Sequence, residues 1–172
     1  QEVPKMLPDM IAAVKACGFD LVIVETPGIG QGDAGIVPHV DLSMYVMSPE
    51  FGAPSQLEKI DMLGFADIVV INKFDRQGAD DALRDVAKQI QRNREAFAVP
   101  ASEMPVFGTI ASRFNDDGVT AVYQEMIRQF NEKGLGHWKS DSKPVARKTS
   151  ETGASIVPPQ RRRYLAEVAE TV

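Results

Sequence analysis

The sequence has 172 residues, a formal net charge of −5, one cysteine and two histidines. This length suits one soluble domain, and the acidic balance argues against nucleic acid or an anionic membrane as the main partner. A single cysteine excludes an internal disulfide, and the chain has too few His and Cys residues for a His/Cys metal cluster. Because no apolar run is long enough to cross a bilayer, we expect a cytoplasmic protein.

The first predicted elements are a helix and a strand. The helix begins at Pro8 and ends before Gly18, and its apolar spacing places Cys17 in the core. The strand covers residues 21–25, where four apolar residues precede a carboxylate, so we expect it to be buried on both faces. Ligands of parallel α/β sheets bind at the carboxyl ends of the strands, which places Glu25 in a functional position.

Strands and helices alternate in the rest of the chain. Strands are predicted over 42–47, 68–71 and 106–110, and helices over 55–65, 80–94 and 119–133. The first of these helices is predicted from a capping box that pairs Ser55 with Glu58. This alternation predicts an α/β fold with a parallel sheet covered by helices on both faces.

The composition changes after residue 135. Residues 136–160 are rich in Ser, Lys, Thr and Pro without apolar periodicity, which predicts a linker that buries no core. Trp138 is its one large apolar residue and is expected to dock on another part of the protein. Residues 161–172 begin with three arginines. This pattern predicts the start of a further helical segment that contacts another domain. Residues 1–135 form the main predicted domain.

The residues Glu25-Thr26-Pro27-Gly28 have the acid-x-x-Gly form of the second phosphate-sensing motif of P-loop nucleotidases. In that motif the acid holds Mg²⁺ and the glycine brings its backbone N–H to the γ-phosphate. The motif is short, and a strand that ends in a tight turn with a solvated Glu25 would show the same residues.

A dinucleotide site is an alternative for the same region. Residues 30–35 match G-x-G-x-x-G, and Glu50 lies at a suitable distance downstream to hold a ribose. However, four residues separate Glu25 from Gly30, whereas the dinucleotide turn needs its first glycine at the strand end. Pro38 would also interrupt the helix that should follow.

The residues Asn72-Lys73-Phe74-Asp75, at the end of a predicted buried strand, have the N-K-x-D form of guanine-recognition motifs. An aspartate can accept hydrogen bonds from the ring N–H and the exocyclic amino group of guanine, a pair that adenine does not offer. A site built on this pair rejects a base that lacks it. We expect Lys73 to pack along the base and ribose, and Asn72 to tie the loop to its neighbours.

A third element is expected after the next strand, where a small-residue loop would reach guanine O6 through backbone N–H groups. Ala111 and Ser112 occupy this position. The acid-x-x-Gly and N-K-x-D motifs occur in the order found in GTPases, at the ends of predicted parallel strands. Together they predict a guanine-nucleotide fold.

The sequence contains no G-x-x-x-x-G-K-[ST] motif. The phosphate cradle, its lysine and the hydroxyl ligand of Mg²⁺ are therefore missing from these residues. Because the phosphate loop precedes the acid-x-x-Gly strand in such proteins, we expect a piece of a longer chain that starts after that loop. By itself this piece should not hydrolyse GTP.

Residues 25–31 together with 72–75 resemble the methylmalonyl-CoA mutase-associated GTPases, which are chaperones of adenosylcobalamin-dependent acyl-CoA mutases. Over about residues 1–135 the sequence is most similar to the branch in which a GTPase domain is fused to the modules of an isobutyryl-CoA mutase. Pro27 stands where a small or β-branched residue is expected.

This resemblance implies a P-loop GTPase fold whose N-terminal strand and phosphate loop lie outside these residues, with GTP or GDP and Mg²⁺ as ligands. It makes Glu25 the metal-associated acid, Gly28 the γ-phosphate sensor and Gln31 a residue that positions water or relays the nucleotide state, although a solvated Gln31 is the alternative. The nucleotide-binding residues are then Asn72, Lys73, Asp75, Ala111 and Ser112. Residues 47–59 correspond to an extra switch, or form an ordinary connection.

The resemblance also implies the activity. The domain would bind and hydrolyse GTP to control cofactor loading or protection in an adenosylcobalamin-dependent isomerase that interconverts isobutyryl-CoA and n-butyryl-CoA. Its partners would be cobalamin-binding and acyl-CoA-binding modules, in a homodimer. The alternatives are a nucleotide-independent scaffold that joins mutase modules and a free-standing mutase-associated GTPase.

Overall fold

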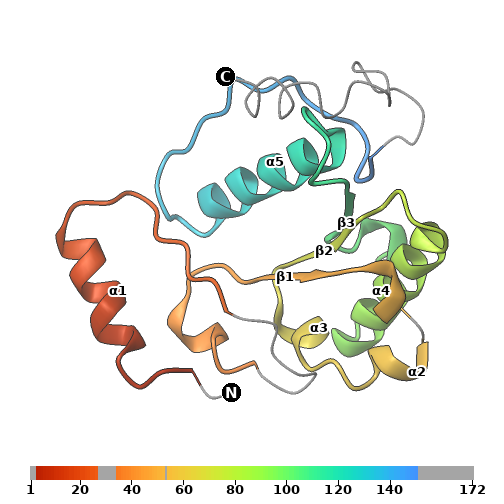
Figure 1. The fold of residues 1–172 in the computed structure, drawn as a ribbon, viewed down its shortest axis with the longest axis horizontal. Helices are drawn as coiled ribbons and strands as arrows, with labels where there is room; N and C mark the ends of the chain where they lie inside the picture. The colour runs from red at the N-terminus through yellow and green to blue at the C-terminus, as the bar shows by residue number, and fades with distance from the viewer. Residues whose placement is uncertain (1–2, 27–33, 53, 151–172) are drawn as a thin grey trace, which may run out of the picture.

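The computed structural model describes residues 3–26, 34–52 and 54–150 (Figure 1). Among them, β1 (Met44–Met47), β2 (Ile68–Asn72) and β3 (Val106–Thr109) form a parallel sheet in the order β1-β2-β3. The strands are in a register that aligns Val46 with Val70 and Val70 with Phe107. The predicted parallel α/β sheet is confirmed, and its central strand β2 is the one marked by an apolar β-branched run.

The helices follow the predicted order with one difference. They are α1 (Leu7–Ala16), α2 (Pro54–Leu57), α3 (Met62–Phe65), α4 (Ala79–Asn93) and α5 (Asp117–Glu132), with 3₁₀ turns at η1 (Val37–His39), η2 (Pro49–Phe51) and η3 (Ala101–Glu103). The single helix predicted over 55–65 is wrong, since a turn separates α2 from α3 and Ser55 lies inside α2 instead of capping it. This break lets Leu57, Ile60 and Leu63 all reach the core.

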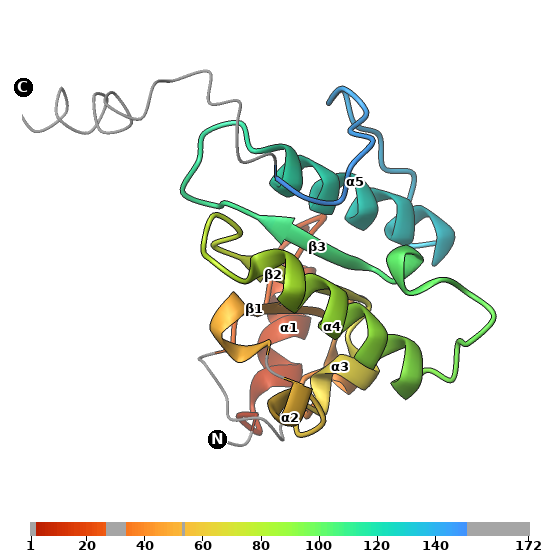
Figure 2. The same cartoon turned by 90° about the vertical axis from the view of Figure 1, so that its right-hand side faces the viewer.

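Helices cover both faces of the sheet, as predicted. Val69 and Ile71 of β2 belong to the core cluster that includes residues of α3 and α4. Ile68 and Val70 point the other way, into a smaller cluster with residues of α5. Figure 2 shows α5 on one side of the strands and α4 on the other. This layering leaves the two ends of the strands as the places where a ligand could bind.

The apolar spacing of the last helix predicts an inward face of Val122, Tyr123, Met126, Ile127 and Phe130, and for α5 this is partly wrong. Val122 and Phe130 are buried as expected, but Tyr123 is 42% exposed and Gln129 is buried in its place. Gln129 can be buried because its side-chain amide donates to Glu125 Oε1 at 2.8 Å and lies 3.4 Å from the Asp67 carbonyl.

The segment 21–25 does not form the predicted buried strand. Its backbone has no regular structure, and Leu21 and Ile23 are 44% and 80% exposed, while Val24 packs against the core. A strand needs a neighbouring backbone to complete its hydrogen bonds, and in the described residues this segment pairs with no strand. The apolar pattern does not specify such a neighbour, and the strand prediction is wrong within the described residues.

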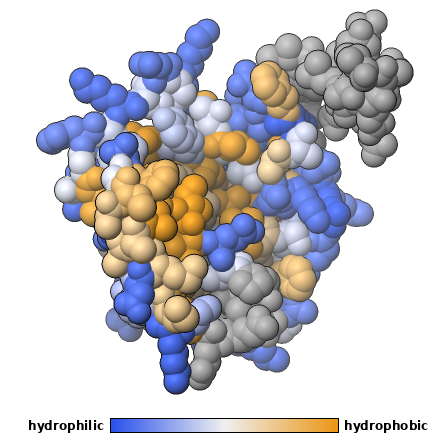
Figure 3. Space-filling view, turned by 60° about the vertical axis from the view of Figure 1, so that its left-hand side comes forward, coloured by the Kyte–Doolittle hydropathy of each residue, from blue (hydrophilic) through white to orange (hydrophobic). Residues whose placement is uncertain are grey.

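The side of the molecule that carries α1 exposes apolar side chains (Figure 3). No residue of α1 is buried, and Met10 is 59% exposed. Cys17 is exposed, so its predicted place in the core is wrong. The physical reason is the same as for residues 21–25, because no described element buries the apolar face that contains Cys17.

The segment after α5 is irregular over 137–147, as a linker should be, but it lies along α5 (Figure 2). The Trp138 ring lies 5.6 Å from the Phe130 ring, and the backbone of Trp138 exchanges two hydrogen bonds with the Asn131 side chain. Phe130 is thus the docking partner expected for Trp138. Residues 151–172 lie outside the described residues, and the domain limits at 135 and 160 stay predictions.

No helix in the described part of the chain has the length and apolar character needed to span a membrane.

Asp67, just before β2, connects three parts of the chain. Its carboxylate lies 2.6 Å from Lys133 Nζ and accepts hydrogen bonds from Ser43 N at 2.8 Å and Ser43 Oγ at 3.0 Å. Burial opposes ionisation, but the bonds from Lys133 and Ser43 outweigh it and lower the pKa of Asp67 below 3.8. The charged form therefore stabilises the fold above about pH 4.

We predict that Asp67→Asn lowers the free energy of unfolding at pH 7 by about 1–2 kcal/mol, because it weakens charge-assisted hydrogen bonds. A depressed carboxyl pKa contributes stability above its unfolded value, and this contribution disappears as the pH falls through the folded value. The difference between variant and wild type should accordingly shrink below pH 3.8. Urea unfolding at several pH values measures it, and a difference that stays constant down to pH 2 would contradict the assignment.

Candidate nucleotide site

Hydrogen bonds join the carboxyl ends of β2 and β3. Asn72 ends β2 and is paired with Thr109 of β3. The Asn72 Oδ1 atom accepts hydrogen bonds from Thr109 Oγ1 at 3.2 Å and from Ala111 N at 3.1 Å. Asn72 therefore ties the loop after β2 to the loop after β3, which is the structural part of the role predicted for it.

Phe74 anchors the N-K-x-D loop to β3. Its ring is buried and packs so closely over Gly108 that a Cβ there would lie 2.4 Å from the ring, and its backbone N–H donates to the Thr109 carbonyl at 3.0 Å. Lys73 adopts a left-handed backbone with φ of 60°. A non-glycine residue in this region is strained, and such strain is held where the surroundings fix the conformation. As a result the side chains of Lys73 and Asp75 point outward and are exposed.

Asp75 lines a hollow of about 600 Å³ formed by residues 74–81, at the start of α4. Its carboxylate makes no hydrogen bond or ion pair with any other described residue. Both oxygens of Asp75 can therefore accept hydrogen bonds from a ligand. This is the chemistry that the N-K-x-D motif predicts for a guanine site.

Residues 110–112, here called the base loop, follow β3. Ala111 and Ser112 are exposed, whereas Ile110 is buried. The Ile110 N–H donates to Asp116 Oδ2 at 3.1 Å, and the same carboxylate caps α5 by accepting from Val119 N at 3.0 Å. The base loop is thus held by Asn72 on one side and Asp116 on the other. Asp116 is not among the residues predicted for the site, although an acid three residues before Val119 is a usual helix cap.

Glu50 lies beside the N-K-x-D loop and not at a ribose site. It forms an ion pair with Arg76, the residue after Asp75. Hydrogen bonds from Ser48 and Arg76 lower the pKa of the Glu50 carboxyl to about 2. The ion pair connects η2, within the proposed extra switch, to the loop that carries Asp75. Most of the glycine pattern of the dinucleotide alternative, residues 30–33, lies outside the described residues.

The phosphate end of the site is only partly described. Glu25 is exposed at the end of the segment 21–26, and Gly28 and Gln31 lie outside the described residues. Within the described part, no group of three or more His, Cys, Asp or Glu residues could hold a metal ion. Mg²⁺ is commonly bound by one or two carboxylates together with phosphate oxygens and water, so a lone Glu25 fits such an ion only when a nucleotide supplies further ligands.

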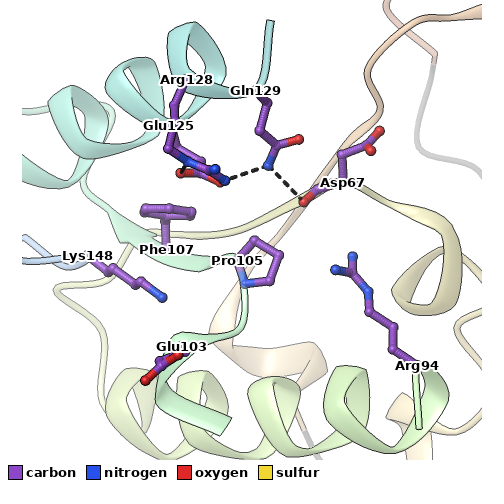
Figure 4. A pocket seen from close by; sticks show the side chains of 9 residues that line it. All are labelled: Asp67, Arg94, Glu103, Pro105, Phe107, Glu125, Arg128, Gln129 and Lys148. Atoms are coloured by element: carbon purple, nitrogen blue, oxygen red, sulfur yellow. Dashed lines mark hydrogen bonds and ion pairs between the residues drawn. The ribbon is translucent and has the colours of Figure 1, made fainter. Parts of the chain in front are cut away.

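A second hollow, of about 490 Å³, opens at the amino ends of the strands (Figure 4). Asp67 and Pro105 precede β2 and β3, so this hollow lies opposite the N-K-x-D loop. Most of its charged groups have partners within the protein: for example, Arg128 pairs with Glu125, and Lys148 Nζ donates to the Met104 carbonyl at 2.9 Å. The lining also contains as many acids as bases, so it offers no net charge to an ionic ligand.

A parallel α/β sheet with N-K-x-D at the end of one strand and a small-residue loop at the end of the next has the architecture of P-loop-type nucleotide-binding proteins. The family model of the methylmalonyl-CoA mutase-associated GTPase MeaB matches residues 3–156, and the chain belongs to this family. This membership overturns the dinucleotide alternative.

The chain is also similar to fused isobutyryl-CoA mutases. It is 64% identical over 172 residues to that of Cupriavidus metallidurans, 58% over 171 residues to that of Nocardia farcinica and 53% over 171 residues to that of Geobacillus kaustophilus. Each alignment covers 99% of this chain. The chain spans 16% of the length of each of these relatives.

Proposed function

We propose that these residues bind the guanine base in a GTPase domain that controls cofactor loading or protection in an adenosylcobalamin-dependent acyl-CoA mutase. The observation that carries this proposal is the geometry around Asp75. Its carboxylate is exposed and has no partner among the described residues, while Asn72 ties its loop to the base loop. An acceptor for two guanine donors and the Ser112 backbone N–H for guanine O6 are thereby brought to the ends of adjacent strands.

Each residue of this site has a proposed task. Asp75 accepts from the ring N–H and the exocyclic amino group of guanine. The backbone N–H of Ser112 faces O6 beside Ala111, whose own N–H donates to Asn72 Oδ1, and the stem of Lys73 packs along the base and ribose. The left-handed backbone at Lys73 supports this arrangement, because it exposes Lys73 and Asp75 while Phe74 stays buried between them.

The phosphate end of the proposed site includes Glu25, Gly28 and Gln31. Glu25 would associate with Mg²⁺, which neutralises charge on the phosphates when bound. Gly28 would sense the γ-phosphate, and Gln31 would position water for in-line attack. Phosphoryl transfer demands mainly positioning and charge stabilisation from the protein, so these few groups suffice once a phosphate loop is supplied. We propose that this loop comes from a longer chain.

We propose a longer cytoplasmic chain in which this domain contacts cobalamin-binding and acyl-CoA-binding modules, as a homodimer that interconverts isobutyryl-CoA and n-butyryl-CoA. The similarity to fused isobutyryl-CoA mutases supports the link to a mutase. The exposed apolar side chains on α1 and on residues 21–25 support further protein contacts on that side of the domain, because large exposed apolar areas usually mark interfaces.

The role of Glu25 is tested with Glu25→Gln in the full-length protein. We predict that Mg²⁺ tightens GDP binding about tenfold or more in the wild type, because a carboxylate helps to hold the ion at the phosphates. In the variant this tightening should fall to about twofold, while the affinity measured in EDTA stays unchanged. Titration calorimetry measures the GDP affinity in Mg²⁺ and in EDTA. The control variant is Asp20→Asn, which changes an acid just before the segment 21–25. Equal tightening in variant and wild type would remove Glu25 from the metal site.

A further inference from the structure

The segment after α5 ends on the sheet, next to the base loop. The Gly108 N–H donates to the Lys148 carbonyl at 2.9 Å, and the Ser150 N–H donates to the Gly108 carbonyl at 3.0 Å. These bonds place Thr149 beside Gly108 in a parallel bridge. Ser150 is 5% exposed. Residues 148–150 thus extend the edge of the sheet beyond β3, although the composition of this segment predicts a linker.

Ser150 contacts the carboxylate that holds the base loop. Its hydroxyl lies 2.6 Å from Asp116 Oδ2 and 3.2 Å from the Gly108 carbonyl. The same Oδ2 atom accepts from Ile110 N, at the start of the base loop, and from Val119 N, in the first turn of α5. The Asp116 side chain is fully buried. One carboxylate oxygen therefore fixes the base loop, the helix and the returning segment relative to one another.

Gly118 has no side chain, and Ser150 occupies the space that a side chain at this position would fill. A Cβ at residue 118 would lie 2.0 Å from the Gly108 carbonyl oxygen and 2.6 Å from Ser150 Oγ. Any side chain there would separate α5 from β3 and displace Ser150. The close approach is an observation independent of the hydrogen bonds, and it shows that this corner is packed around the Ser150 hydroxyl.

We propose that Ser150 is a positioning residue of the guanine site, which acts through Asp116 to hold the base loop where the Ser112 N–H reaches guanine O6. This inference rests on the proposed function. Without the Ser150 hydroxyl, the Asp116 carboxylate loses a hydrogen bond in a buried place and can shift, and Ile110 shifts with it. Asp75 bonds neither Asp116 nor Ser150, because its loop is anchored through Phe74 and Asn72, so its contacts to guanine change less than those of the base loop.

The test compares two nucleotides in the full-length protein. GDP presents O6, whereas 6-thio-GDP keeps both donors for Asp75 but carries sulfur, a weak acceptor, in place of O6. We expect Ser150→Ala to weaken GDP binding about tenfold and 6-thio-GDP binding less than twofold. Ser150→Cys, which keeps a weak donor, should lie between Ser150→Ala and wild type. Ser142→Ala is the matched control, because Ser142 bonds with Gln124 and Ser140 in the same segment.

The outcomes separate the inference from the function on which it rests. Equal losses for the two nucleotides in both Ser150 variants, or no loss for either nucleotide, would overturn the positioning role while leaving a guanine site in place. A loss of folded protein lowers the binding of GDP and of 6-thio-GDP together, so it cannot imitate a selective loss for GDP. If wild-type protein binds GDP no better than ADP, the proposed function itself fails.

Discussion

Asp75→Asn is expected to weaken GDP binding by the full-length protein about a hundredfold or more, because two hydrogen bonds to a charged acceptor contribute about 1.5–3 kcal/mol each. The amide that replaces the carboxylate presents one donor group and one acceptor oxygen. It matches xanthine, which carries a carbonyl where guanine has its amino group. The variant should therefore gain affinity for xanthosine diphosphate as it loses affinity for GDP. Competition with a fluorescent nucleotide measures both affinities.

The control for this exchange is Asp80→Asn. Asp80 lines the same hollow from the first turn of α4 and is exposed like Asp75, so it reports any general effect of removing a negative charge there. The GDP affinity of the Asp80→Asn variant should stay within about twofold of wild type, since an exposed charge that touches no ligand contributes little. A weaker GDP complex with no gain for the xanthine nucleotide would mean that Asp75 supports the loop without contacting the base.

Gly118→Ala is expected to lower the free energy of unfolding by about 3 kcal/mol, which is at the upper end of the usual cost of overpacking. The new methyl group would lie 2.0 Å from the Gly108 carbonyl oxygen, and that atom belongs to backbone that cannot rotate away. The helix α5 and the strand β3 must then move apart, which weakens the smaller core cluster and the corner around Asp116. Urea unfolding followed by circular dichroism measures the loss.

Gly64→Ala is the matched control for this substitution. Gly64 lies in the short helix α3, and a Cβ there would be 3.9 Å from the nearest atom, in the Asn93 side chain. Alanine should be neutral or stabilise by up to about 1 kcal/mol at such a site. If both variants unfold at the same urea concentration as wild type, the close packing of α5 on β3 is not present in solution.

The parts of the structure that could be predicted from the sequence are those with a local signal. The run 68–71 is apolar and β-branched, and it forms most of β2; the periodicity of 80–94 predicts α4 within one residue at each end. The N-K-x-D pattern follows β2 directly, so its place at the carboxyl edge of the sheet follows from the strand assignment. The structure adds the buried Phe74 and the left-handed Lys73, which explain how the loop exposes Asp75.

The parts that could not be predicted depend on contacts distant in sequence. Residues 21–25 have the apolar pattern of a strand, but a strand also requires a neighbour, and no local pattern specifies one. Ser150 and Asp116 are 34 residues apart, and a serine in a polar segment gives no signal that it will be buried. The apolar spacing of the first helix predicts Cys17 in the core, whereas burial depends on what packs over the helix.

The central claim is that this domain prefers guanine nucleotides, and it is tested most directly by measuring the affinities of the full-length wild-type protein for GDP, ADP, xanthosine diphosphate and NAD under the same conditions. The structure of the Asp75 site predicts GDP binding at least about a hundredfold tighter than binding of the other three, because a site built to bond a donor pair rejects a base that lacks it. Equal affinities for GDP and ADP, or no binding of any nucleotide, would contradict a guanine site and leave a scaffold that joins mutase modules.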